Sequence, residues 1–218
     1  SDVYKRQAES LLEEKSAELY AANQRLQQLL GQRDSQINRH HSAFYQLSQT
    51  FLRLGKDGIR NIEELTSVCG ELLGTDLALY HSGAPHYRRI AQWSKLNVPA
   101  ELEALLLNQS RAVNQHSVLG VHVENFTAES SKMHPELGFS TCISHAVMRD
   151  GQCVGVLALW YQRTHQISDF EQQIIEMIAT AIGIEEDRLS SQKEIRQRQE
   201  KYETCLLYTS DAADEEDS

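Results

Sequence analysis

Phe139 to Arg188 reads FSTCISHAVMRDGQCVGVLALWYQRTHQISDFEQQIIEMIATAIGIEEDR, and this stretch decides the fold. It opens with an alternating run, Ser140–Met148. Asp150-Gly151 then stands between two apolar runs, which is a strong short-range signal for a β-hairpin. The second run, Cys153–Trp160, is apolar almost throughout, as is typical of a strand buried on both faces. We therefore expect two antiparallel strands joined at this turn.

A helix is expected to begin soon after the second strand. In Ser168-Asp169-Phe170-Glu171 the Ser oxygen and the Glu three residues later can satisfy each other's orphan backbone donors, which makes a capping box. One apolar helical stripe follows it, formed by Phe170, Ile174, Ile175, Met177, Ile178, Ala181 and Ile182.

This order of elements resembles the C-terminal half of a GAF domain from a bacterial sensory or signal-transduction protein, of the sensor histidine kinase or diguanylate cyclase type. The resemblance is carried by the turn at DG, the strand GVLAL, the helix start SDFE and the helix IATAIGIEEDRL, and it covers about residues 60–189. It implies an α+β fold, in which an antiparallel GAF/PAS-like sheet has flanking helices and a small ligand pocket on one face.

Both ends of the chain resemble translated sequencing adapter. Ser1–Gln7 matches one strand of a transposase-library adapter, and Cys205–Glu215 matches nearly all of its reverse complement. We therefore expect scars at residues 1–7 and 205–218 and exclude them from fold reasoning. The alternative for the second segment is an ordinary acidic tail. Its five acidic residues account for half of the formal net charge of −10.

The rest of the chain is only modestly acidic, which argues against nucleic-acid binding, because that function needs a basic face. No apolar run of 18 or more residues occurs, so no membrane contact is expected in this fragment. Because we expect the adapter to have replaced the natural N-terminus, the sequence does not decide whether a membrane helix or signal peptide lies upstream. Cys69, Cys142 and Cys153 are scattered without a CxxC motif, as is typical of reduced thiols in a cytoplasmic protein.

Residues 8–55 have the pattern of a coiled-coil helix. Its apolar stripe repeats every seven residues with one inserted step of four, a stutter, and consists of Leu12, Leu19, Leu26, Leu30, Ile37, Phe44 and Phe51. A single helix this long cannot bury its stripe alone, so we expect a homodimer through parallel helices. The alternative is a solvated helix that folds back on its own domain. A helical linker at 190–204, leading to a missing output or PAS domain, is expected after the sensor domain.

The sensor domain is expected at residues 56–189. Its first helix, Arg60–Leu73, should end at Gly74, because glycine is well suited to the position after a helix. Short strands are expected at Asp76–Ser82, Tyr87–Trp93 and Ser117–Phe126, with a helix that begins near Asn97. In GAF domains the segment equivalent to Thr127–Leu137 forms one wall of the ligand pocket.

The sequence offers no catalytic residues and no metal site. It contains no nucleophile beside a base, no glycine-rich phosphate loop and no histidines at metal-ligand spacing. Some GAF sensors bind haem through a single histidine, so one of the histidines could be a haem ligand in principle, but haem is not expected here. Phytochrome-like GAF domains attach a bilin to a cysteine ahead of the strand that here begins at GFS, but Ser130–Gly138 contains none, so no covalent bilin is expected. The cofactor is therefore unknown.

The resemblance places a ligand pocket against the sheet. Its candidate lining residues, mostly aromatic and on or near expected strands, are Tyr80, Trp93, Phe126, Met133, Cys142, Ser144 and Trp160. The alternative is that the aromatic residues simply fill the core.

These features predict a regulatory, small-molecule-sensing GAF module. It would relay a ligand-dependent change through dimeric helices to a missing output domain, a histidine kinase or diguanylate cyclase. One alternative is a thiol-based reductase of the free-methionine-sulfoxide-reductase GAF type, in which Cys142 and Cys153 meet across the hairpin. The competing interpretation of the two cysteines is that both are small, buried residues that only pack in the core. A purely structural dimerisation module is the second alternative.

Overall fold

The computed structural model describes residues 2–83, 88–96, 121–125 and 138–216. Two compact units make up the chain, Ser1–Gln49 and Thr50–Ser218. Its elements are, in order, α1 (Asp2–Arg53), α2 (Gly58–Leu73), β1 (Leu77–Ser82), β2 (Arg88–Ser94), β3 (Val121–Asn125), β4 (Thr141–Arg149), β5 (Gln152–Tyr161) and α4 (Asp169–Glu216). The helix expected near Asn97 and the segment Thr127–Leu137 lie outside the described residues.

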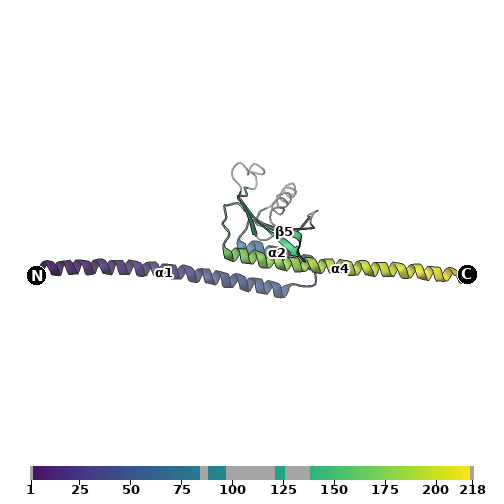
Figure 1. Cartoon of the computed structure of the whole chain (residues 1–218), viewed down its shortest axis with the longest axis horizontal. Helices are drawn as coiled ribbons and strands as arrows, with labels where there is room; N and C mark the ends of the chain where they lie inside the picture. Colours follow the sequence, from purple (N-terminus) through teal and green to yellow (C-terminus); the bar gives the residue numbers. More distant parts are fainter. Residues whose placement is uncertain (1, 84–87, 97–120, 126–137, 217–218) are drawn as a thin grey trace. The chain divides into compact units, whose positions relative to one another are not determined.

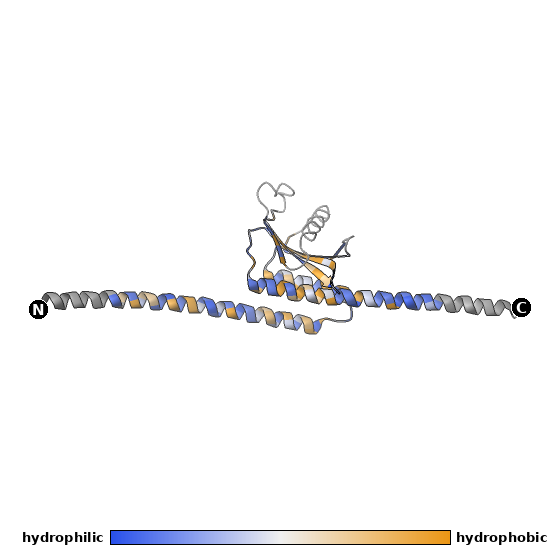
Figure 2. Ribbon diagram, viewed as in Figure 1, coloured by the Kyte–Doolittle hydropathy of each residue, from blue (hydrophilic) through white to orange (hydrophobic). Residues whose placement is uncertain are grey.

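The first unit lies within α1, whose apolar stripe is exposed. Leu19 is 71% exposed and Leu26 is 56% exposed, and the stripe continues through Leu30, Ile37 and Phe44, which are also exposed. Figure 2 shows hydrophobic and hydrophilic residues interspersed along this helix. The helix predicted from the pattern is therefore confirmed, while its pairing with a second copy stays a prediction.

The second unit is built on a five-stranded antiparallel sheet with the strand order β2-β1-β5-β4-β3. The expected hairpin joins β4 to β5, with Arg149 opposite Gln152. Asp150 and Gly151 both have positive φ angles, 48° and 76°, which is the backbone of the tight turn that Asp-Gly favours. The expected α+β fold is thus confirmed at the stretch that decides it.

Local chemistry at their ends explains where the two helices of this unit begin. Asp57 caps α2, because its carboxylate accepts hydrogen bonds from the backbone N–H groups of Ile59 and Arg60, and Gly74 ends the helix in the left-handed conformation. The capping box of α4 is confirmed: the N–H of Ser168 donates to Glu171 Oε2 at 2.8 Å, and the N–H of Glu171 donates to Ser168 Oγ at 3.3 Å.

Helices α2 and α4 pack against each other and against one face of the sheet (Figure 1). The buried stripe of α4 includes Ile174, Ile178 and Ile182, while α2 buries Ile62 and Leu65. The core of the unit therefore lies between the helix pair and the sheet.

Candidate functional site: the distal face of the sheet

Strand alternation assigns each residue of the sheet to one of two faces. The Tyr80 hydroxyl donates a hydrogen bond to Glu186 Oε1 on α4 at 2.8 Å, so Tyr80 points toward the helices. Residues that share its row, such as Leu157, point the same way, and their neighbours in sequence point the opposite way. We call the first surface the helix face and the second the distal face.

Two rows of paired residues cross the distal face from β1 to β3. One row is Leu79, Ala158, Ser144 and His122, and the next is Leu77, Trp160, Cys142 and Glu124. The middle of this surface carries small side chains, whereas the large ring of Trp160 stands beside them.

Most of the distal face is buried. Leu77, Leu79, Cys142, Ala158 and Trp160 form one apolar cluster, and all are at most 2% exposed. The ring of Phe139 packs on this cluster, with its centroid 5.5 Å from that of Trp160. An apolar surface this thoroughly buried can hold a flat, largely apolar molecule or another part of the protein.

Polar side chains lie at set places in this apolar surface. Ser144 in the middle and His81 at the end of β1 are both buried, while His122 and Glu124 on the edge strand β3 are half-buried. A few polar groups in an apolar wall are the usual means by which a binding site orients its ligand.

The two fully buried thiols, those of Cys142 and Cys69, are held in their neutral form. Burial raises the pKa of the Cys142 thiol well above its usual range, and the nearby Glu124 carboxylate raises it further. Burial likewise raises the pKa of Cys69, which packs in the apolar face of α2. Since the thiolate is the reactive form, neither thiol is prepared for nucleophilic chemistry.

The alternative in which Cys142 and Cys153 meet across the hairpin is contradicted by the strand register. Cys142 pairs with Trp160, whereas Cys153 pairs with Met148, six positions further along β4. At the rise of a β-strand this separates the two cysteines by roughly 20 Å, far beyond the Cα–Cα reach of a disulfide. The two-residue turn is the physical reason, because it sets Cys153 close to the loop end of the hairpin.

Of the seven candidate pocket residues, the structure brings three together on the distal face: Cys142, Ser144 and Trp160. Tyr80 and Trp93 lie on the helix face instead. Trp93 pairs with Ala78, and its ring packs so closely on α2 that Gly70 has no room for a Cβ atom. Phe126 and Met133 lie outside the described residues.

Sequence reasoning missed the β1 part of this surface, namely Leu77, Leu79 and His81, and the central Ala158. Their alternation was visible in the sequence, but the pairing of β1 with β5 was not. That pairing joins residues about 80 positions apart, and no local pattern specifies it.

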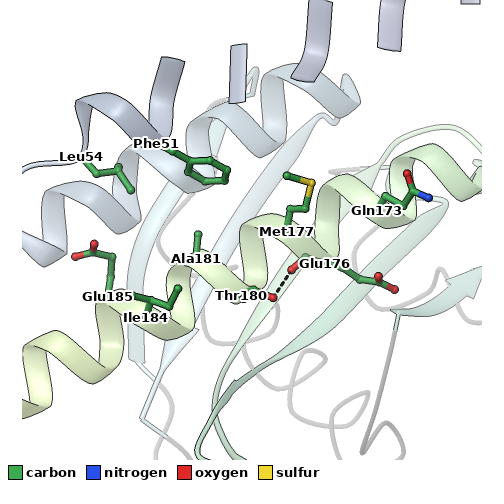
Figure 3. A pocket seen from close by; sticks show the side chains of 9 residues that line it. All are labelled: Phe51, Leu54, Gln173, Glu176, Met177, Thr180, Ala181, Ile184 and Glu185. Atoms are coloured by element: carbon green, nitrogen blue, oxygen red, sulfur yellow. Dashed lines mark hydrogen bonds between the residues drawn. The ribbon is translucent and has the colours of Figure 1, made fainter. Parts of the chain in front are cut away.

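A concave surface lies between α4 and the end of α1 (Figure 3). This groove of about 570 Å³ is lined by Phe51, Leu54, Gln173, Glu176, Met177, Thr180, Ala181, Ile184 and Glu185. Phe51 is the last residue of the α1 stripe, and Ile184 is 64% exposed. The last residue of the α1 stripe therefore lines an apolar groove whose other residues belong mostly to α4.

Within the described ranges, no group of three or more His, Cys, Asp or Glu side chains is placed to hold a metal ion. Among the helices that the structure describes, none combines the length and the apolar character needed to cross a membrane.

Two solved bacteriophytochrome structures have a similar fold. The chromophore-binding domain of an unusual bacteriophytochrome from R. palustris matches with a TM-score of 0.53 and 14% identity, over 73% of this chain and 62% of that one. A longer structure of a bacteriophytochrome from this organism matches with a TM-score of 0.52 and 14% identity, over 75% and 39% of the two chains. This chain therefore spans only part of either protein.

A domain of a protein described as a two-component sensor histidine kinase, from Sinorhizobium meliloti 1021, matches with a TM-score of 0.49 and 19% identity, over 62% of this chain and 94% of that one. No curated protein sequence matches the chain. Residues 56–185 match the model of the GAF domain, which covers more than half of the chain and includes α2, the sheet and the first part of α4. The chain belongs to the GAF domain family.

Proposed function

We propose that this chain is the sensory module of a signalling protein and binds a small molecule on the distal face of its sheet. Binding there would change how α1 and α4 are held, and a dimer would pass the change to an output domain, a histidine kinase or a diguanylate cyclase. Such a relay requires that the ligand bind the two helix arrangements with unequal affinity.

The observation that carries the proposal is the composition of the buried distal face. Small side chains, Ala158, Ser144 and Cys142, occupy its middle, and Trp160 and Leu79 flank them. Small residues beside an aromatic ring make a flat apolar wall on which a planar ligand would stack, and the Ser144 hydroxyl would fix its orientation.

The reductase alternative has no support from the geometry. Cys142 and Cys153 are too far apart to form a disulfide, and the Cys142 thiol is held neutral by burial. The proposal is therefore regulatory ligand binding rather than thiol chemistry.

Ligand binding is tested by thermal unfolding of the purified protein with four named probes: biliverdin, haemin, cyclic AMP and cyclic GMP. A ligand at 100 times its dissociation constant stabilises the folded state by about 2.7 kcal/mol, which raises the unfolding temperature by several degrees. Extraction and mass spectrometry of the purified protein would also reveal a molecule that copurifies with it. The proposal predicts a stabilising probe or a copurifying molecule, and finding neither contradicts it.

Two matched variants locate the binding site. Ala158→Phe fills the middle of the distal face and should abolish the stabilisation, whereas Ala181→Phe adds the same ring in the groove of α4 and should leave it intact. Ser144→Ala keeps the volume of the site and should weaken binding through the lost hydroxyl. A ligand effect removed only by Ala181→Phe would place the site on α4 instead.

The dimer part of the proposal is supported by the exposed stripe of α1 and is tested by sedimentation. Replacing Leu19 and Leu26 with glutamine should convert a dimer into a monomer, because both side chains lie on the expected seam. Ala17→Gln, which introduces the same side chain on the opposite, exposed side of this helix, is the matched control and should leave the dimer intact. A wild-type protein that sediments as a monomer at high concentration would contradict the dimer.

A further inference from the structure

The junction between α1 and α2 is held by an unusual set of hydrogen bonds centred on Gly55. The N–H of Gly55 donates to Asn61 Oδ1 at 2.9 Å, and Asn61 Nδ2 donates back to the Gly55 carbonyl at 3.1 Å. The same carbonyl accepts a third hydrogen bond, at 2.7 Å, from Arg188 Nη1 on α4. We call these three side-chain contacts the Gly55 clasp.

The α2 side of the clasp is rigid. Asn61 is 3% exposed, and its backbone N–H donates to the carbonyl of Asp57, the residue that caps α2. The first turn of α2 also lies directly against α4, since a Cβ atom on Gly58 would come within 2.9 Å of Leu189. Only a glycine at position 58 lets the two helices approach this closely without displacing that side chain.

The α4 side of the clasp is positioned by a charge that is otherwise costly to bury. Glu185 is 6% exposed, and one of its oxygens lies 3.3 Å from Arg188 Nη1, one turn further along the helix. A buried carboxylate requires a close cation, so Glu185 keeps the guanidinium where it reaches the Gly55 carbonyl. The charge-assisted bond from Arg188 is therefore the part of the clasp that joins α4 to the end of α1.

The same turn of α4 also holds the sheet. Glu186, next to Glu185, accepts the hydrogen bond from the Tyr80 hydroxyl, and Gly155 on β5 leaves the space that this hydroxyl occupies. Tyr80 stands in β1 between Leu79 and His81, two residues of the distal face. One turn of α4 is therefore hydrogen-bonded both to β1, through Glu186, and to the α1–α2 junction, through Arg188.

We propose that the turn Glu185–Arg188 couples the sheet to the end of α1, so that the Tyr80–Glu186 bond and the Arg188–Gly55 bond strengthen and weaken together. A displacement of β1 would pull or release Glu186, and the rigid turn would move Arg188 relative to the fixed Gly55–Asn61 pair. This inference rests on the proposed function for its trigger, since a ligand on the distal face contacts β1. The coupling itself exists in the ligand-free protein.

The test measures amide hydrogen exchange in the peptide that contains Gly55, in the full chain and without any ligand. Each rate is taken relative to that of the buried α2 peptide around Leu65 in the same sample, so that a general loss of stability cancels. Arg188→Gln removes the bond at the clasp and should accelerate exchange at Gly55 about fivefold, as expected for one lost hydrogen bond.

The decisive variants are Tyr80→Phe and Glu186→Gln, which leave every atom of the clasp in place. Both should accelerate exchange at Gly55, and the double variant Tyr80→Phe with Arg188→Gln should exchange no faster than Arg188→Gln alone. Arg196→Gln, which breaks an exposed pair with Glu200 further along α4, is the control and should change nothing.

Three outcomes would overturn the coupling. The first is exchange at Gly55 that Tyr80→Phe and Glu186→Gln do not alter. The second is strict additivity in the double variant, and the third is no effect of Arg188→Gln. A ligand that stabilises the wild type together with any of these results would refute the coupling and leave the sensory function standing. If the variants behave as the coupling predicts but no ligand stabilises the wild type, the coupling stands and its proposed trigger does not.

Discussion

The two faces of the sheet are made from alternate residues of the same five strands, yet they are built in opposite ways. The helix face presents large side chains such as Tyr80, Leu157 and Leu159 to α2 and α4. The distal face has small side chains in its middle, Ala158 and Ser144, with the large groups beside them. The same backbone therefore supports a packed core on one face and a candidate binding surface on the other.

Glycines show where the helices come closest to the helix face. A Cβ atom on Gly70 of α2 would collide with the Trp93 ring, and one on Gly183 of α4 would approach the Met148 carbonyl to 2.5 Å. At these two points, therefore, the helices lie in close contact with residues of the strands. Close packing of this kind makes substitutions on the helix face destabilising. A ligand site, in contrast, needs room for the bound molecule.

The largest effect is expected from truncating the helix face. Leu159→Ala should lower the free energy of unfolding by about 3 kcal/mol, because the cavity forms in a core that α2 and α4 close. Leu79→Ala, the same change on the distal face of the neighbouring strand, should cost about 1 kcal/mol less. Urea denaturation measures both values. Equal costs would show that the distal face is packed as tightly as the helix face.

A somewhat smaller effect is expected from Trp160→Leu on the distal face. The protein should still fold cooperatively and lose about 2 kcal/mol of stability, since leucine fills part of the space of the indole. Stabilisation by a bound ligand should disappear with the ring. Tyr161→Leu is the matched control, because its ring faces the helices and stacks on His165 at 4.2 Å. Tyr161→Leu should destabilise the fold and keep the stabilisation by ligand. If Tyr161→Leu abolishes that stabilisation and Trp160→Leu keeps it, the ligand binds on the helix face instead.

Features that depend on local chemistry could be predicted from the sequence. The capping box of Ser168 and Glu171, the turn at Asp150-Gly151 and the helix end at Gly74 each need only a few adjacent residues. Each of them forms in the structure as expected, because the stabilising contacts lie within one or two turns of chain.

Features that depend on strand pairing could only partly be predicted. The alternation of β1 puts Tyr80 and Leu79 on opposite faces, but only the pairing of β1 with β5 and of β5 with β4 shows that Leu79, and not Tyr80, shares a face with Cys142. The side of Trp93 depends on the pairing of β1 with β2, which shifts between Tyr80 and His81. By contrast, the distance between Cys142 and Cys153 was already implied by the sequence, since a two-residue turn sets Cys153 near Met148.

The smallest effect is expected from a histidine on the helix face. Burial lowers the pKa of His145 below its ordinary value of about 6.5, and this outweighs the opposing effects of the Ala146 carbonyl and the Glu176 carboxylate. The ring is therefore neutral in the folded protein at a pH where the unfolded chain already binds a proton. The contribution of His145 to stability is full above pH 6.5 and is lost as the pH falls from there toward the folded pKa.

His145→Gln should remove this part of the pH dependence and keep a polar side chain near the Ala146 carbonyl, which the Nδ1 atom of His145 contacts at 2.7 Å. Urea denaturation of both proteins at pH 7.5 and pH 5.5 isolates the effect, because the other titrating groups are common to both and cancel in the difference. The wild type should lose more stability than the variant on acidification. An equal loss would mean that the helix face does not keep this ring neutral, and that the contrast between the two faces lies in packing alone.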